Sequence, residues 1–396
     1  MENNYNRLFM IIFLGIISAM APLATDMYLP ALPVMQAEFG ISTSLIQLTL
    51  TMTMVGMALG QIFAGPISDM RGRKQPLFVG MLVFMLTSIV CVITTDIRIF
   101  LAARFIQGLS GACGVVLARA IARDICQGPE LTRFFSILMM VNGLAPILAP
   151  VMGGQIVTLL SWQYVFVVLA FIGLTMAVAT VICKETLPPE RRIKNVLRTI
   201  LVFPKLVKDR YFMGHCLVQM FVFSAFFIYI GSSSFVFQGI YHVSPQAYSF
   251  IFGFIGAGIM VAGTLPAKFA GRIRDEVMLR WSIVLQLGMT MGLIAAFYWE
   301  APVEVIVILL LLIAMPISIV GAASFSLGLS AQGRNAGSAS ALLGFSSMIL
   351  GGIMMPVVGL LGTDSGLPMA SMMLLGFVLA ISACEIMVMP RHRKSS

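Results

Sequence analysis

Three ionisable side chains interrupt otherwise apolar runs of this sequence: Asp26, Arg104 and Glu385. An ionisable group at membrane depth is costly, so each one marks a place where chemistry can occur. Asp26 lies shortly before the outer end of the first apolar run, and Arg104 lies shortly after the start of the fourth. At about 1.5 Å per residue both groups lie roughly 8 to 9 Å deep, which predicts that they share one level of a cavity.

The chemistry expected of such a pair is proton exchange. Burial favours the neutral acid of Asp26, whereas a nearby guanidinium favours the carboxylate. A carboxyl group balanced between these effects takes up or releases a proton when solvent access or a bound ligand changes. The alternative is a structural ion pair that ties two spans together. Glu385 lies near the inner end of the last run beside Arg391, and we expect it to be a surface carboxylate.

The elements that position these groups are membrane spans. The chain has 396 residues, of which 59% are hydrophobic and only 10% are charged, with a mean hydropathy of +0.99. This composition excludes an ordinary soluble domain. Since one span needs about 20 apolar residues, the chain has room for about twelve spans and little else. We predict spans near residues 8–33, 45–67, 76–95, 99–121, 133–157, 162–183, 212–238, 247–268, 278–298, 303–328, 337–362 and 368–389.

The basic residues set the orientation of these spans. With a cytoplasmic N-terminus, 23 of the 25 Lys and Arg residues fall on inner loops or inner span ends. Such an asymmetry predicts that both termini are cytoplasmic, and it explains the net charge of +9 without a nucleic-acid partner. The only long polar stretch divides the chain into a six-helix bundle (1–183), a cytoplasmic linker (184–211) and a second six-helix bundle with a short tail (212–396). Two such halves indicate a parallel internal repeat.

Other function classes find little support. Six Cys without a CxxC pair and three His predict neither a metal site nor a disulfide framework, and we expect no cofactor. No GxxxxGK phosphate loop is present, so ATP is not the expected energy source. Residues 108–111 (GLSG) superficially resemble the serine motif of rhomboid proteases, but no His lies at that depth to act as a base. The chain is therefore not expected to be an enzyme.

The loop between the second and third spans carries an ordered motif. Residues 65–74 read GPISDMRGRK, in which Gly72 permits a tight turn and Asp69 could cap a helix. The segment resembles the signature of the major facilitator superfamily, G-x-x-x-D-x-x-G-R-K. Residues 104–108 (RFIQG) are similar to its R-x-x-Q-G motif, and residues 149–154 (APVMGG) resemble its antiporter motif G-P-x-x-G-G, with Ala149 replacing the first Gly. The resemblance implies the all-α fold of that superfamily, twelve helices in two pseudo-symmetric bundles.

Further segments narrow the resemblance to the Bcr/CflA group of drug-resistance transporters. They are residues 24–33 (ATDMYLPALP), 184–192 (KETLPPERR), 234–238 (SFVFQ) and 336–344 (AGSASALLG). The resemblance implies a proton-coupled exporter of bicyclomycin-, phenicol- or sulfonamide-like antibiotics. On that analogy Asp26 is the proton-linked group and Arg104 is its charged partner. Some related antiporters carry a second carboxylate two turns earlier; position 18 is Ser here, which favours one proton per cycle.

The loop signature also resembles a charge relay of the superfamily. The resemblance implies that Asp69 faces the start of span eleven near Gly337, and that Arg73 pairs with Asp124 on the loop between spans four and five. Such a latch would favour the outward-open state. The alternative is that these three are solvated loop charges.

Aromatic side chains, with Met, could form an adaptable apolar pocket for flat drugs, because rings stack and thioethers reshape easily. Our candidates for substrate contact near a central cavity are Tyr28, Gln107, Asn142, Phe226, Tyr229, Phe235 and Gln238.

Uptake of a small nutrient or metabolite by the same fold is the second hypothesis, because fold does not fix function. Few polar side chains in the spans argue against a sugar site. The partners expected for the leading hypothesis are a small-molecule drug, protons and the lipid bilayer of the inner membrane, with no nucleic acid. A monomer is expected, since two halves make a complete pathway.

Overall fold

In the ranges that it describes, the computed structural model contains helices joined by short turns and irregular segments, and no strands. Those ranges are residues 7–126, 128–192, 203–269, 272–330, 332, 336–362 and 364–389. Within them, twelve helices are long and apolar enough to cross a membrane. They lie at Leu8–Phe39, Thr43–Arg71, Lys74–Ile93, Ile97–Ile125, Met140–Leu159, Gln163–Ile182, Arg210–Ile240, Pro245–Ala262, Asp275–Tyr298, Val303–Ser330, Gly337–Leu360 and Leu367–Val388. The all-helical fold and the twelve predicted spans are confirmed, with most ends displaced by only a few residues.

The chain divides into two compact units. Unit 1 comprises Met1–Ala31 and Met52–Thr199, and unit 2 comprises Leu32–Thr51 and Ile200–Ser396. Unit 1 holds α1 (Arg7–Ser18), α2 (Met20–Asp26), η1 (Leu29–Ala31), most of α4 (Thr43–Arg71), α5 (Lys74–Ile93), α6 (Ile97–Ile125), α7 (Gly128–Leu159), α8 (Gln163–Ile182) and η2 (Pro189–Arg191). Unit 2 holds α3 (Leu32–Phe39), the start of α4, α10 (Phe203–Lys208), α11 (Arg210–Phe235), η3 (Val236–Ile240), α12 (Pro245–Ala262), α13 (Leu265–Phe269), α14 (Asp275–Tyr298), α15 (Val303–Ala314), α16 (Ile317–Ser330), α17 (Ala336–Leu360), α18 (Leu367–Ala383) and η5 (Cys384–Val388).

Unit 1 differs from the predicted bundle of residues 1–183 in two places: it lacks residues 32–51, and it includes the first part of the predicted linker, through Thr199. Polar side chains in the segment 32–51 bond to backbone carbonyls elsewhere in unit 2. Ser44 Oγ donates to the carbonyl of Pro356 at 2.7 Å, and Gln47 Nε2 donates to that of Gly231 at 2.9 Å. Thr51 Oγ1 donates to the carbonyl of Gly352. These bonds attach the segment to α11 and α17, which the apolar pattern of the sequence could not indicate.

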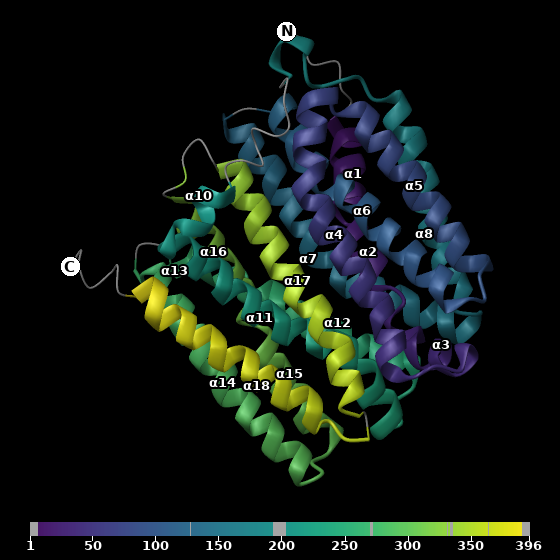
Figure 1. The fold of residues 1–396 in the computed structure, drawn as a ribbon, viewed down its shortest axis with the longest axis vertical. Coiled ribbons are helices and arrows are strands. Elements are labelled where there is room, and N and C mark those ends of the chain that lie inside the picture. Colours follow the sequence, from purple (N-terminus) through teal and green to yellow (C-terminus); the bar gives the residue numbers. More distant parts are fainter. Residues whose placement is uncertain are drawn as a thin grey trace. The chain divides into compact units, whose positions relative to one another are not determined.

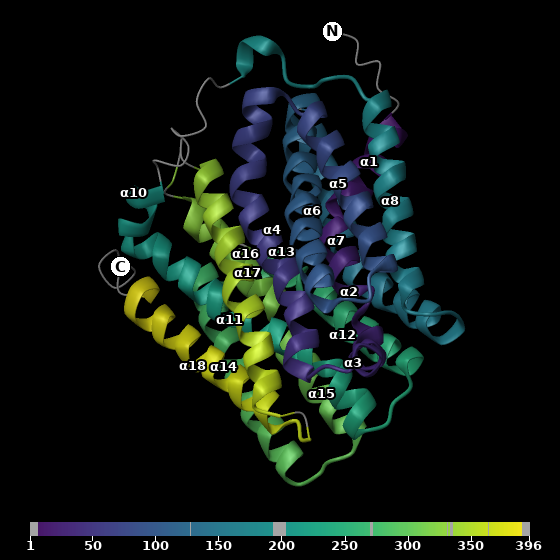
Figure 2. The same ribbon diagram turned by 45° about the vertical axis from the view of Figure 1, so that its right-hand side comes forward.

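Glycines set the spacing of the helices in unit 1. A Cβ at Gly56 would collide with the backbone of Phe105, and one at Gly108 would collide with the backbone of Thr53. Helices α4 and α6 thus approach to backbone contact, as small residues allow in membrane proteins. On the other side of α6, Figures 1 and 2 show α5 lying between α6 and α8, and both neighbours pack against it.

Helix α11 is the centre of unit 2. It packs against α16, α17 and α18, and α14 lies alongside α18 in both views (Figures 1 and 2). Its buried side chains include polar ones along its length, among them His215, Gln219 and Ser233.

The first span is not one continuous helix. It is divided into α1, α2, η1 and α3, and α2 ends at Asp26. Pro30 contributes to this break, because it has no N–H to donate to the carbonyl four residues earlier. Irregular backbone at membrane depth occurs where protein buries it or where it lines a cavity. The break places Asp26 and the carbonyls of the last turn of α2 among neighbouring helices.

Candidate functional site

Asp26 is the last residue of α2 and is only 6% exposed. Its Oδ1 accepts a hydrogen bond from Thr25 Oγ1 at 2.7 Å. Helix α7 packs against the backbone of Met27, the residue that follows Asp26: a Cβ at Gly153 of α7 would collide with the main chain of Met27. Gly153, the first glycine of the motif at residues 149–154, is thus the point at which α7 meets the broken span. Ala149, where the motif has Gly, is fully buried, so this substitution does not keep α7 away from α2.

Arg104 of α6 is completely buried. Its Nη2 donates to the carbonyl of Ala24 at 2.8 Å, and its Nη1 donates to Gln107 Oε1. The guanidinium carbon lies 4.3 Å from the centroid of the Tyr28 ring and 5.4 Å from that of Phe166, within the range of cation–π attraction. A cation therefore sits at the C-terminal end of α2, where the helix dipole and the unpaired carbonyls favour positive charge.

A hydrogen-bonded chain continues from Arg104 into α5. Gln107 Nε2 donates to Ser88 Oγ at 2.7 Å, and Ser88 Oγ donates to the carbonyl of Phe84 at 2.7 Å. Because Gln107 is held at both ends of its amide, the Arg104 guanidinium is fixed in position. This cluster joins α2, α5 and α6.

The sequence led us to expect Arg104 as the direct charged partner of Asp26. Among the ion pairs of the described residues, no such pair occurs. Arg104 reaches the first span at the carbonyl of Ala24, two residues before Asp26, instead of at the carboxylate. The break after α2 explains the difference, because it frees a carbonyl that competes for the guanidinium.

The side chains of the three candidates for substrate contact in unit 1 interact with other groups of the protein. Tyr28 is fully buried beneath Arg104, and Gln107 bridges Arg104 and Ser88. Asn142 of α7 is half-buried; its Nδ2 donates to the carbonyl of Leu138 at 2.9 Å and to Ser18 Oγ at 3.4 Å. Tyr28 and Gln107 therefore position Arg104 in this structure, whereas Asn142 retains partial exposure.

Two of the candidates in unit 2, Phe226 and Tyr229, belong to an aromatic cluster on α11 and α12. Phe226 lies 6.0 Å from Tyr229, ring centroid to ring centroid, and Tyr229 stacks on Phe252 at 5.8 Å and 10°. Phe252 in turn contacts Tyr248 at 6.1 Å, and Tyr248 Oη is 2.9 Å from Ser233 Oγ. Our sequence analysis missed Tyr248 and Phe252, although their spacing of four residues places them on one face of a helix.

The last two candidates lie just beyond the cluster. Phe235 ends α11 and is 6% exposed, whereas Gln238 lies in the π-helical turn η3 and is half-buried. A π-helical segment within a span is frequently found at functional sites.

The motif of residues 65–74 contributes to a compact charge cluster. Arg73 Nε donates to Asp124 Oδ2 at 2.9 Å, and its Nη1 donates to Asp69 Oδ1 and, at 2.7 Å, to Ser68 Oγ. Burial alone would lower the pKa of Arg73, but its hydrogen bonds to Asp124 and Asp69 raise that pKa above the ordinary value. The structure thus brings Arg73, Asp69 and Asp124 together, instead of leaving them as separate solvated charges. Asp124 lies in the last turn of α6 and not on a loop, because α6 extends to Ile125. The approach of Asp69 to the start of span eleven stays a prediction.

Other polar features are separate from these clusters. Glu385 pairs with Arg280 at 2.5 Å across α14 and η5, whereas Arg391, its expected neighbour, lies outside the described residues. Ser110 donates to the carbonyl of Gln107 in its own helix at 2.9 Å. In the described part of the chain, no group of His, Cys, Asp and Glu side chains could hold a metal ion.

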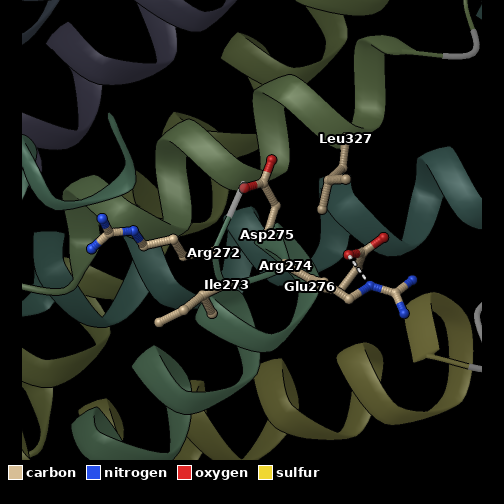
Figure 3. A pocket seen from close by; sticks show the side chains of 6 residues that line it. All are labelled: Arg272, Ile273, Arg274, Asp275, Glu276 and Leu327. Atoms are coloured by element: carbon tan, nitrogen blue, oxygen red, sulfur yellow. Dashed lines mark ion pairs between the residues drawn. The ribbon is translucent and has the colours of Figure 1, made fainter. Parts of the chain in front are cut away.

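A surface pocket of about 410 Å³ lies beside the start of α14 (Figure 3). Its lining mixes two basic and two acidic side chains, and Arg274 Nε lies 4.0 Å from Glu276 Oε2. With such balanced charge it offers no preference for an ion of either sign. Its lining residues are Arg272, Ile273, Arg274, Asp275, Glu276 and Leu327.

Twelve spans, a broken first span and a buried carboxyl beside a buried guanidinium define a class of protein, the polytopic helical membrane transporters. The chain belongs to the Major Facilitator Superfamily, which matches residues 14–356. This is a family of transporters and not of enzymes. The chain is thus a multi-pass membrane protein.

Two relatives are similar over nearly the whole chain. One is "Uncharacterized MFS-type transporter YdgK" of Bacillus subtilis, 38% identical over 379 residues, covering 95% of this chain and 93% of the relative. The other is "Bicyclomycin resistance protein homolog" of Haemophilus influenzae, 31% identical over 371 residues and covering 93% of each. Among solved structures, a D-xylose-proton symporter has a TM-score of 0.72 at 14% identity, with coverage of 94% of this chain and 96% of that one. At that identity the likeness shows the fold alone.

Proposed function

We propose that this protein exports small antibiotics in exchange for protons, by alternating access of its two six-helix halves. The observation that carries the proposal is the buried Asp26 at the break in span one, next to the Arg104 cluster. The relative named for bicyclomycin resistance supports bicyclomycin-like compounds as substrates. Phenicol- and sulfonamide-like compounds are proposed on the resemblance of the sequence to the Bcr/CflA group alone. The proposed location is the inner membrane, with both termini cytoplasmic and a monomer as the working unit.

In this proposal Asp26 carries the proton. Burial of Asp26 favours the neutral acid. The positive charge of Arg104, which binds the carbonyl of Ala24 two residues before Asp26, favours the carboxylate. For coupling, drug binding needs only to favour the deprotonated form of Asp26. Drug and proton then oppose each other's binding even if they bind different atoms. No carboxylate among the described residues hydrogen-bonds to the buried Arg104, so a negative Asp26 supplies the compensating charge available on α2.

The driving force is sufficient for resistance. Entry of one proton across about 100 mV supplies about 2.3 kcal/mol. With about 1.4 kcal/mol for each tenfold ratio, that sustains a gradient of roughly 50-fold for a neutral drug.

Asp69, Arg73 and Asp124 form the second part of the proposal, a cytoplasmic latch that favours the outward-open state. The two ion pairs of Arg73 and its hydrogen bond to Ser68 support the view that these residues act as one unit. Within unit 2, the aromatic cluster of Phe226, Tyr229 and Phe252 is proposed to stack on flat drugs, with Gln238 as a polar contact. Within unit 1, Asn142 is proposed as a polar contact.

The test is uptake of bicyclomycin or a phenicol into inverted vesicles, with and without a protonophore. We expect uptake by the wild type to collapse with the protonophore, and Asp26→Asn to abolish the protonophore-sensitive part, since the amide cannot exchange a proton. The control is Glu385→Gln, which removes a half-exposed carboxyl of unit 2 whose ion pair with Arg280 contributes little. It should transport normally.

Full proton-driven export by Asp26→Asn would overturn the assignment of this residue. Uptake that ignores the protonophore would point to facilitated diffusion or another coupling ion. If no candidate drug enters the vesicles, growth on single nutrients becomes the deciding experiment for the uptake hypothesis.

A further inference from the structure

Glu185 lies three residues beyond the end of α8, at the start of the linker, yet its carboxylate is bound to the loop between α4 and α5. Its Oε1 accepts from the backbone N–H of Arg73 at 2.8 Å, and its Oε2 accepts from that of Lys74 at 3.2 Å. The backbone N–H groups of Thr186 and Leu187 also donate to Oε1, each at 3.0 Å. Both carboxylate oxygens are therefore used, and four backbone amides depend on one side chain.

The amides of Arg73 and Lys74 belong to the N-terminus of α5, where helices leave N–H groups unpaired. The side chain at the N-cap position, Arg73, makes no capping hydrogen bond, and the first turn of α5 contains no acidic residue. Glu185 supplies both the missing acceptor and the negative charge that the helix dipole favours there. Helix α5 is therefore capped by a residue more than one hundred positions away in the sequence.

Gly72 makes room for this carboxylate. Its φ of 93° lies in the left-handed region, which favours glycine. A Cβ at this position would also collide with the Glu185 carboxylate. Gly72 of the motif of residues 65–74 therefore serves two purposes: it adopts the backbone conformation of the turn, and it leaves space for the Glu185 carboxylate.

The start of the linker also contacts the rest of the charge cluster. Thr186 Oγ1 donates to Asp124 Oδ2 at 3.2 Å, the same oxygen that accepts from Arg73 Nε. Lys74 Nζ donates to the carbonyl of Val181 at 2.6 Å. Burial alone would raise the pKa of Glu185, but its backbone hydrogen bonds lower that pKa, so the carboxylate is charged at neutral pH.

We propose that Glu185 is a positioning residue of the cytoplasmic latch: by binding the backbone of Arg73 it fixes the guanidinium against Asp124, and it couples the linker to the latch. This inference rests on the proposed latch and not on the identity of the drug. The backbone of Arg73 is held by Glu185 and its side chain by Asp69 and Asp124, so release of the linker removes the backbone restraint and weakens the hold on the guanidinium. A carboxylate that served only as a fold anchor would contribute to stability without influencing the transport cycle.

The decisive variant is Glu185→Gln, which keeps the shape of the side chain but removes its charge and half of its acceptor capacity. The matched control is Glu190→Gln, an exposed carboxyl in η2 of the same linker. Three measurements compare them with the wild type: hydrogen exchange of the amides of residues 73–74 and 186–187, alkylation of Cys126, and drug counterflow in proteoliposomes. Cys126 is 6% exposed at the end of α6, two residues from Asp124, and would be the single cysteine of these variants.

For Glu185→Gln we expect faster exchange of those amides and roughly fivefold faster alkylation of Cys126. In counterflow, the maximal rate should fall roughly fivefold while the half-saturating drug concentration stays unchanged, since the drug site is not touched. Combination with Asp124→Asn should add little, because both changes release the same guanidinium. Glu190→Gln should match the wild type in every measurement.

Wild-type alkylation and counterflow by Glu185→Gln would overturn the proposal, even if the amides exchange faster, because Glu185 would then be only an anchor. A fully additive loss with Asp124→Asn would overturn it as well. Counterflow needs no proton gradient, so failure of the Asp26 assignment leaves this test intact. If no candidate drug is transported, the alkylation of Cys126 still decides.

Discussion

At the scale of single residues, the site depends on how one buried guanidinium is held. Arg104 donates in two directions, to Ala24 on α2 and to Gln107 on α6, and it stacks on Tyr28. A planar fork that also stacks on aromatic rings is a property of Arg and not of Lys. The exact chemistry of this position therefore matters more than its charge.

Arg104→Lys should lower drug uptake by inverted vesicles at least about tenfold, because a single ammonium cannot replace both hydrogen bonds and the stacking. Arg98→Lys, at an exposed position near the start of α6, is the matched control and should retain wild-type uptake. Equal uptake by both variants, at equal protein yield, would show that charge alone suffices at position 104.

Glu185 gives a pH dependence whose sign follows from its depressed pKa. At pH values above the ordinary pKa of 4.5, the Glu185 carboxylate stabilises the folded state at full strength. That contribution is lost as the pH falls through the lower pKa that Glu185 has in the folded protein. Protection of the amides of Arg73 and Lys74 against hydrogen exchange, corrected for intrinsic rates, should therefore stay constant near neutrality and fall in acid. In Glu185→Gln the acid-dependent step should be missing; a step that persists there would belong to another group.

At the scale of elements, backbone contact between helices fixes where the site residues lie. Helices α4 and α6 meet at Gly56 and Gly108, and α7 meets the broken span at Gly153. The sequence showed the glycines but not their partners, because Gly is common in membrane helices and each could face lipid.

Gly108→Ala should destabilise the protein by about 1 to 3 kcal/mol, because the new methyl group would collide with the rigid backbone of Thr53. Gly288→Ala on α14 is its control: a Cβ there meets nothing within 4 Å, and no loss of stability is expected. Thermal unfolding in detergent compares the two. Similar midpoints for both variants would mean that α4 and α6 can separate at little cost.

At the scale of the whole molecule, the distribution of Lys and Arg predicts the orientation of the chain. Since 23 of the 25 basic residues fall on one side of the predicted spans, both termini should be cytoplasmic. A green fluorescent protein fused after residue 396 should be fluorescent, whereas alkaline phosphatase at the same point should be inactive. The same phosphatase fused in the loop after Thr94 should be active, and the opposite pattern would invert the topology.

The sequence by itself determined the twelve spans and their all-helical class, because apolar length and backbone hydrogen bonding leave a membrane segment few choices. The superfamily was indicated by the resemblance of its motifs, and the family match confirms it. Span positions also predicted that Asp26 and Arg104 lie at similar depth, and the resemblance of the loop signature implied that Arg73, Asp69 and Asp124 belong together. Only the tertiary structure decided that Arg104 binds the carbonyl of Ala24, that Tyr28 and Gln107 serve Arg104, and that Glu185 caps α5. Hydropathy and spacing record depth and periodicity along one chain, whereas these contacts depend on which carbonyls a helix break exposes and on how closely glycines let helices approach.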